Sequence, residues 1–238
     1  MGNDMVYEPA NAVAFRQRLL THPGERQDVD YKSSMAFATD DSFSLNLIRH
    51  IQGMANAGGG WLVIGFIQTG DQNWVPDPTH TNGICSSYDP TRLTQQVDSS
   101  LMRGQRVRLT VYFEVHPSSG LQHPMIQVNG FERLPCICRS DRIASDTHEQ
   151  ILRQGQVHLR RPGAETAPVS TPQDWEDLIN LCIRLRRDEF LNEFRGLFER
   201  MISTSQPSSP ATEELSTWMG QMRNRAFGNT GEGEGQVT

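Results

Sequence analysis

Lysine is almost absent from this chain of 238 residues, in which Lys32 stands beside 21 arginines. Aromatic residues make up only 8% of the chain, and no run of 18 or more apolar residues occurs, which excludes a transmembrane helix. The first residues carry neither a basic region nor an apolar core, so we expect no signal peptide. With four cysteines and no secretory signal, we expect a reduced, cytoplasmic setting and no membrane contact.

Several catalytic signatures are missing as well. The sequence contains no His-Glu-x-x-His zinc motif and no Gly-x-Ser-x-Gly nucleophile elbow. Its glycine run ends in Trp61 rather than in the Lys and Ser or Thr that close a Walker phosphate loop. The net charge is −6, and residues 162–238, with 7 basic and 12 acidic side chains, hold −5 of it. Overall charge therefore does not by itself indicate nucleic-acid binding.

Hydrophobic spacing predicts the order of helices and strands. The predicted helices have apolar residues every three or four positions and cover 13–20, 42–55 and 90–102. The predicted strands alternate in polarity or are continuously apolar, and they cover 28–31, 61–66, 107–115, 124–128, 134–139 and 157–159. An imperfect capping box at Ser145 predicts a helix over 145–154, and the polar stretch 70–87 predicts a long loop.

These elements predict one main α+β domain over residues 8–161. A linker over 162–173 precedes a helical C-terminal appendage at 174–202, whose apolar residues lie on two faces. Such a helix is typically buried or paired, although a break near 184–189 is the alternative. Residues 203–238 are rich in Ser, Pro, Gly and Glu and are predicted to be a mostly disordered tail with one short helix.

Three short motifs stand out in the main domain. Glu25 is followed after four residues by Asp30-Tyr31-Lys32, the run Met54–Gly65 contains three consecutive glycines, and a looser motif spans Cys136–Ala144. Together they resemble motifs of the Schlafen/AlbA-like domain family, and the resemblance covers roughly residues 8–160. It implies a mixed sheet with flanking helices and a nucleic-acid-binding role.

The resemblance also implies a catalytic reading of the acidic motif. In Schlafen-type nucleases, two acids at this spacing and a third after the glycine-rich strand are thought to hold a divalent metal. Glu25 and Asp30 would then be catalytic residues and metal ligands of an endoribonuclease that uses Mg²⁺ or Mn²⁺. The third acid is missing, because residues 65–68 read Gly-Phe-Ile-Gln where the family has Gly-Val-Asp-Asp, and the nearest acid is Asp71. A surface pairing with a neighbouring basic side chain is the alternative reading.

Arginine clusters and the glycine turn supply candidate phosphate contacts, since guanidinium groups grip phosphate and exposed backbone amides bind anions. The alternatives are a solvated charged face and a plain helix-to-strand turn. The candidates are Lys32, Arg49, Asn56, Gly58, Gly59, Arg103, Arg106, Arg108, Arg139 and Arg142, with Arg153, Arg160 and Arg161 closing the domain. The aromatic residues expected at the surface are Trp61, Trp74 and Tyr88, too few to read a single strand base by base.

The sequence thus predicts a nucleic-acid-binding protein that grips the phosphate backbone of RNA or DNA without catalysis and without a cofactor. The resemblance implies a clamp of two such lobes around an RNA duplex, so we expect a homodimer formed through the helix at 174–202. One alternative is the metal-dependent endoribonuclease. Another is an interaction module in a defence or mobile-element complex, which the acidic C-terminal region favours.

Overall fold

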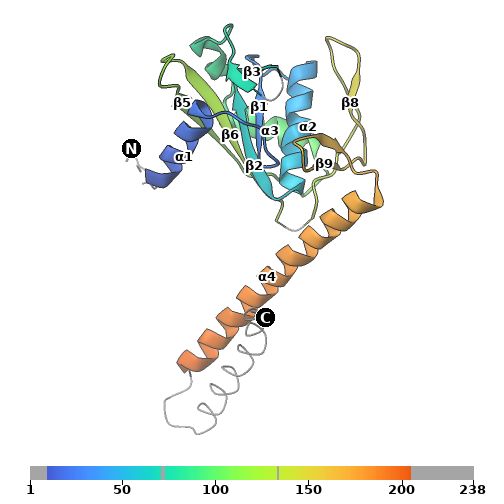
Figure 1. Cartoon of the computed structure of the whole chain (residues 1–238). Helices are drawn as coiled ribbons and strands as arrows, with labels where there is room; N and C mark the ends of the chain where they lie inside the picture. The colour runs from blue at the N-terminus through green and yellow to red at the C-terminus, as the bar shows by residue number, and fades with distance from the viewer. Residues whose placement is uncertain (1–9, 71–72, 133, 205–238) are drawn as a thin grey trace, which may run out of the picture. The chain divides into compact units, whose positions relative to one another are not determined.

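The computed structural model describes residues 10–70, 73–132 and 134–204. A four-stranded mixed sheet lies at its centre, in the strand order β1-β2-β6-β5 (Figure 1). Its strands are β1 (Val29–Lys32), β2 (Gly59–Ile64), β5 (Leu109–Val115) and β6 (Gln122–Asn129). β1 runs parallel to β2, and the other neighbours are antiparallel. The prediction of an α+β fold with flanking helices and a helical C-terminal segment is confirmed.

Helices cover both faces of this sheet. α1 (Ala10–Thr21) packs on one face, over a cluster that includes Val63 of β2. α2 (Ser42–Asn56) and α3 (Pro90–Ser100) pack on the other face, over a larger cluster that includes Leu62. Because successive side chains of a strand point to opposite faces, neighbouring residues of β2 enter different cores.

Capping residues set where two of these helices begin. Asp41 accepts a hydrogen bond from the backbone N–H of Ser44 (2.6 Å), and Asp89 accepts one from the N–H of Arg92 (2.8 Å). Each carboxylate satisfies a donor that the first helical turn leaves unpaired. Pro90, which follows Asp89, has a backbone angle suited to the first helical position.

Six short strands form two-stranded sheets beside the main sheet. They are β3 (Phe66–Thr69) with β4 (Asn73–Pro76), β7 (Arg142–Ile143) with β8 (Gln150–Leu152), and β9 (His158–Arg160) with β10 (Thr166–Pro168). The prediction of a helix from Ser145 was wrong, because residues 145–147 form a turn and β8 pairs with β7. The loop predicted over 70–87 contains β4 and a 3₁₀-helix, Asn82–Ser87.

No regular strand forms over 134–139, where the sequence predicts one. Side chains satisfy part of its backbone: Asn56 and Gln52 bond to Cys136, and Gln105 accepts from the N–H of Ile137. Other groups of the stretch bond to backbone at 100–102 and 155–156 without forming a strand ladder. A single bridge between Leu101 and Cys138 is the only strand-like pairing of this stretch within the described residues. Side-chain amides have thus taken the place of a neighbouring strand for part of this stretch.

The C-terminal helix α4 (Pro172–Thr204) is continuous, so the alternative of a break near 184–189 does not hold. The described residues divide into two compact units after Leu185. Within the first unit, Leu178 of α4 is buried in the core around α2. Residues 162–173, predicted as a linker, contain β10, which pairs with β9.

No helix among the described residues has the length and apolar character needed to cross a membrane. The tail at 205–238 lies outside the described residues.

Candidate functional site

The acidic motif forms a compact charged cluster on β1. Asp30 is only 1% exposed, and its carboxylate lies 2.8 Å from Lys32 Nζ, 3.2 Å from His50 Nδ1 and 3.3 Å from Arg160 Nη2. Glu25 hydrogen-bonds with Asp30 from the preceding loop. Asp30 and Lys32 share a strand face because they are two positions apart, and α2 brings His50 to that face. We call these five residues the Asp30 cluster.

Arg160 corrects one sequence-based expectation. The sequence counts it among the phosphate contacts, yet its side chain is fully buried. Besides Asp30, it lies within hydrogen-bond distance of Val29 O (3.3 Å) and Thr166 Oγ1 (3.4 Å). A buried guanidinium needs a buried counter-charge, and Asp30 supplies it. Arg160 is therefore a structural partner of β1 and is not available to a ligand.

The two carboxyl groups of the cluster have very different acidities. Burial and the hydrogen bond with Asp30 raise the pKa of Glu25 to about 7. Burial alone would raise the pKa of Asp30, but the hydrogen bond from Glu25 and the charges of Lys32, His50 and Arg160 lower it to about 2. Burial lowers the pKa of His50 to about 3. At neutral pH, Asp30 is therefore ionised, His50 is neutral, and Glu25 can gain or lose a proton.

A depression of about 530 Å³ opens beside the Asp30 cluster. Lys32, Arg49 and Trp74 line it, and so does Gln68 of β3, which is one of the positions where the Schlafen/AlbA-like sequence pattern would have an acid. The structure thus brings the acidic motif and the substituted position together, while Asp71 lies outside the described residues.

The described residues alone do not complete a divalent-metal site in this depression. Among the described residues, no three His, Cys, Asp or Glu side chains gather as ligands. A cation placed on the Asp30 carboxylate would also stand against Lys32 and Arg160, which already neutralise it. Whether Glu25 and Asp30 hold a metal together with Asp71 stays a prediction.

Asn56 has a structural position that the sequence did not reveal. It is fully buried, and its amide donates to Cys136 O (3.0 Å) and His158 O (2.8 Å) and accepts from Cys136 N (2.7 Å). With all three hydrogen bonds inside the protein, Asn56 is not available for nucleic acid. It joins the end of α2 to two later segments of the chain.

Glycines are required at this turn because a neighbouring backbone segment approaches it closely. Gly58 and Gly59 have φ values of 103° and 110°, which other residues rarely adopt. A Cβ on Gly59 would lie 2.7 Å from Val128 O, so a side chain there would push β2 away from β6. The N–H of Gly58 donates to Ala55 O (3.3 Å), so this amide is already used within the turn. These contacts support the reading of a helix-to-strand turn.

Three chain segments bring exposed arginines together. Met102 N–H donates to Ile137 O (3.0 Å), Arg139 N–H donates to Ser100 O (2.9 Å), and Gly155 N–H donates to Cys138 O (2.9 Å). These bonds place Arg103, Arg139 and Arg153 on neighbouring backbone segments, each with an exposed side chain that makes no ion pair within the described ranges. A tight turn links Arg103 to the arginines before β5. We call this region the arginine surface, formed by Arg103, Arg106, Arg108, Arg139 and Arg153.

Nearby acidic side chains partly neutralise the positive charge of the arginine surface. Arg108 pairs with Glu132 (2.6 Å), both largely exposed, and Arg106 lies near Asp98. Arg142, another predicted phosphate contact, pairs with Asp40 and so links β7 to the loop before α2. An exposed pair is worth only about 0–1 kcal/mol, so Arg108 can exchange its partner for a phosphate.

Of the three aromatic residues expected at the surface, Tyr88 is fully buried, and its hydroxyl donates to Met35 O (2.6 Å). Trp61 and Trp74 are half-buried. Trp74 packs against Tyr31 with ring centroids 5.5 Å apart. Only the two tryptophans therefore retain an accessible surface.

Comparison with known proteins gives little. No protein-family model and no curated protein matches the chain. Among solved structures, the DIP2311 protein from Corynebacterium diphtheriae is similar, with 16% sequence identity and a TM-score of 0.39. The similar region covers 70% of this chain and 28% of that one, so this chain spans less than a third of that protein's length. A similarity this distant gives no indication of function.

Proposed function

We propose that the chain binds the phosphate backbone of RNA or DNA through the arginine surface, without catalysis. The convergence of Arg103, Arg139 and Arg153 from three separate segments supports this. Guanidinium groups bind phosphate oxygens in pairs, and they do so independently of base sequence. The surface lies within residues 1–161, which carry only −1 of the net charge of −6, whereas residues 162–238 carry −5.

Replacing Arg103, Arg139 and Arg153 by alanine should weaken binding to labelled RNA and duplex DNA alike. For duplex DNA, the slope of log affinity against log salt should shrink by about 0.9 for each phosphate that the variant no longer binds. Fluorescence anisotropy over about 50–200 mM salt measures both effects. Arg18→Ala is the matched control, because Arg18 is an exposed arginine on α1. A triple variant that keeps the wild-type affinity and slope would refute the proposal.

The geometry also favours a second candidate, the metal-dependent endoribonuclease, in one respect. Glu25, with a pKa of about 7, lies beside Asp30 and near Gln68 in one depression. The binding samples can be read for cleavage after incubation with Mg²⁺, Mn²⁺ or EDTA. Metal-dependent cleavage that is lost in Glu25→Gln would support the nuclease. RNA that stays intact with both metals would rule it out for that substrate.

We further propose that α4 joins two copies of the chain. Trp175, Ile179 and Ile183 recur every four residues and are 47%, 53% and 58% exposed. The sequence also places basic residues at 184–187 directly before acidic residues at 188–193. An antiparallel partner helix would set these opposite charges against each other while covering the apolar side chains.

Light scattering should therefore give a mass of twice the 26.8 kDa of one chain. The variant Ile179→Glu/Ile183→Glu should give one chain, because a charge buried at a helix interface is costly. Asn180→Glu is the control, since Asn180 is an exposed polar residue of the same helix. A wild-type mass of 26.8 kDa at every concentration would contradict the dimer.

A further inference from the structure

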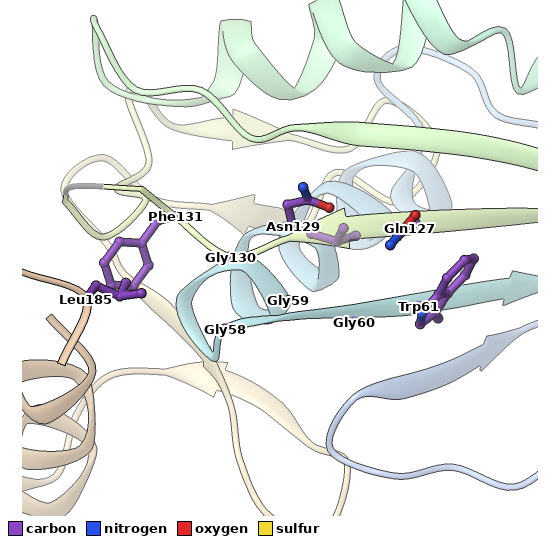
Figure 2. Close-up of a pocket in the computed structure, with 10 residues that line it drawn as sticks. Gly58, Gly59, Gly60, Trp61, Gln127, Asn129, Gly130, Phe131 and Leu185 are labelled. Carbon is purple, nitrogen blue, oxygen red and sulfur yellow. The ribbon is translucent and has the colours of Figure 1, made fainter. Parts of the chain in front are cut away.

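A second depression, of about 460 Å³, lies where β2 begins and β6 ends. Figure 2 shows its lining: the glycine turn forms one part, Trp61 stands at one end, and Phe131 and Leu185 stand at the other. A Cβ on Gly58 would meet nothing within 4 Å, so the backbone of the turn is uncovered at this residue. The volume falls in the range typical of small-ligand sites, about 300–1,000 Å³.

Two primary amides face this space from β6. The strand register sets Gln127 opposite Trp61 and Asn129 opposite Gly59, so these side chains share one face of the sheet. Gln127 Oε1 accepts from the Tyr112 hydroxyl (3.3 Å), and its Nε2 makes no hydrogen bond within the described part of the chain. The exposed side chain of Asn129 makes none there either. A primary amide offers a donor beside an acceptor, the pattern that pairs with the edge of a nucleobase.

Trp61 supplies an aromatic surface beside these amides. Its ring packs against Phe15 and Tyr112, with centroids 5.7 Å away in each case. These neighbours fix the ring, while the half-buried side chain still lines the depression. A fixed, partly open aromatic ring is the usual stacking platform for an unpaired base. We call Trp61, Gln127 and Asn129, with the three glycines, the amide pocket.

The amide pocket adjoins the arginine surface. Asn129 also lines a larger depression of about 810 Å³ that includes Arg106 and Arg108, and its N–H donates to Arg108 O (3.0 Å). Guanidinium groups that can bind phosphate and amides that can pair with a base therefore lie next to each other, at Asn129. This adjacency matches the two chemically different ends of a nucleotide.

We propose that the amide pocket receives one unpaired base of a nucleic-acid strand whose phosphates contact Arg106 and Arg108. The proposal rests on the proposed function and adds that the strand is single where it crosses the end of β2 and β6. A base inside a duplex has its edge paired and both faces stacked, so it cannot enter. The pocket takes one base, consistent with too few aromatics to read a strand base by base.

The test compares a short single-stranded oligonucleotide with the same strand carrying abasic sites. Wild-type protein should bind the intact strand roughly 5- to 100-fold more tightly, the range expected for one stacked base. Gln127→Ala/Asn129→Ala should reduce this preference, because the base then keeps only its stacking on Trp61, and should leave the affinity for the abasic strand unchanged; a variant that keeps the full wild-type preference would refute the pairing with the amides. Arg106→Ala/Arg108→Ala should weaken both strands in parallel.

The control variant is Asn11→Ala/Gln95→Ala, which removes two exposed amides on α1 and α3 and should preserve the preference for the intact strand. Asn129→Ala alone repeats the test at an exposed position, where folding is not at risk. If wild-type protein binds intact and abasic strands equally, the amide pocket is refuted and phosphate binding stands. If it retains neither strand, the amide pocket is refuted, and the anisotropy measurement with RNA and duplex DNA decides the proposal of phosphate binding separately.

Discussion

Replacing Asp30 by asparagine should lower the free energy of unfolding by about 3–5 kcal/mol, the cost of removing one partner of a buried ion pair. Asparagine keeps the shape of the side chain but removes its charge. The guanidinium of Arg160, 3.3 Å away and fully buried, would then have no counter-charge. Lys32 would lose its partner as well, although its side chain is 23% exposed and can turn to water.

Urea denaturation measures this loss, and Asp28→Asn is the matched control. Asp28 lies two positions before Asp30 and pairs with Arg26 at the surface, where both side chains are more than half exposed. Its substitution should change stability by no more than about 0.5 kcal/mol. Adding Arg160→Met to Asp30→Asn should recover part of the loss, because the buried charge is then gone. Equal stability of Asp30→Asn and Asp28→Asn would contradict the buried ion pair.

This prediction affects how a nuclease test is read. Loss of cleavage in Asp30→Asn would report damage to β1 as readily as loss of a metal ligand. Glu25→Gln separates the two, because Glu25 is half-buried and already close to half protonated at neutral pH. A neutral glutamine therefore resembles one of its two normal states.

Replacing Asn56 by alanine should destabilise the protein by a similar amount. The substitution removes the hydrogen-bond partner of Cys136 N and of His158 O, while Cys136 O keeps its bond from Gln52. A buried polar group left unpaired costs about 1–3 kcal/mol, so we expect a total of roughly 3–5 kcal/mol. Alanine also leaves a small cavity at the end of α2, since Asn56 is fully buried.

Urea denaturation again gives the free energy, and hydrogen exchange of the Cys136 amide locates the effect. That amide should exchange faster in Asn56→Ala, because it loses its acceptor. Asn180→Ala is the control: Asn180 is exposed on α4, where alanine is the better helix former. Unchanged protection of the Cys136 amide would contradict the role given to Asn56.

Much of the fold follows from local patterns, and the exceptions have physical causes. The segments 28–31 and 107–115 alternate in polarity, 124–128 is mostly apolar, and each corresponds to a strand of the main sheet. The helix predicted from Ser145 was wrong because a capping pattern reports only the local sequence. The pairing of β8 with β7 is a tertiary contact that overrides this local preference. The strand predicted over 134–139 was wrong because an apolar run does not show that part of its backbone will hydrogen-bond to side chains.

The site divides in the same way. The resemblance of the acidic motif to the Schlafen pattern implies that Glu25 and Asp30 lie together, and their carboxyl groups are in contact. His50 and Arg160 could not be predicted as their partners, because those contacts depend on how distant segments are placed. Nor could the sequence show that Asn129 shares a face of the sheet with Trp61. Alternation tells which residues of one strand share a face, but only the pairing register tells which residues of the neighbouring strand lie on that same face.

The bond between β1 and Arg160 has a consequence for synthesis of the chain. Arg160 reaches Val29 across 131 positions of sequence, and Asn56 reaches His158 across 102. A ribosome adds about 5–20 residues per second, so Asp30 emerges on the order of ten seconds before its buried counter-ion. Until then the Asp30 carboxylate has only the partly exposed Lys32 as a counter-charge, which opposes burial of β1. The acidic motif on β1 is therefore the first motif to be synthesised but is among the last parts of the chain to be stabilised by its buried partner.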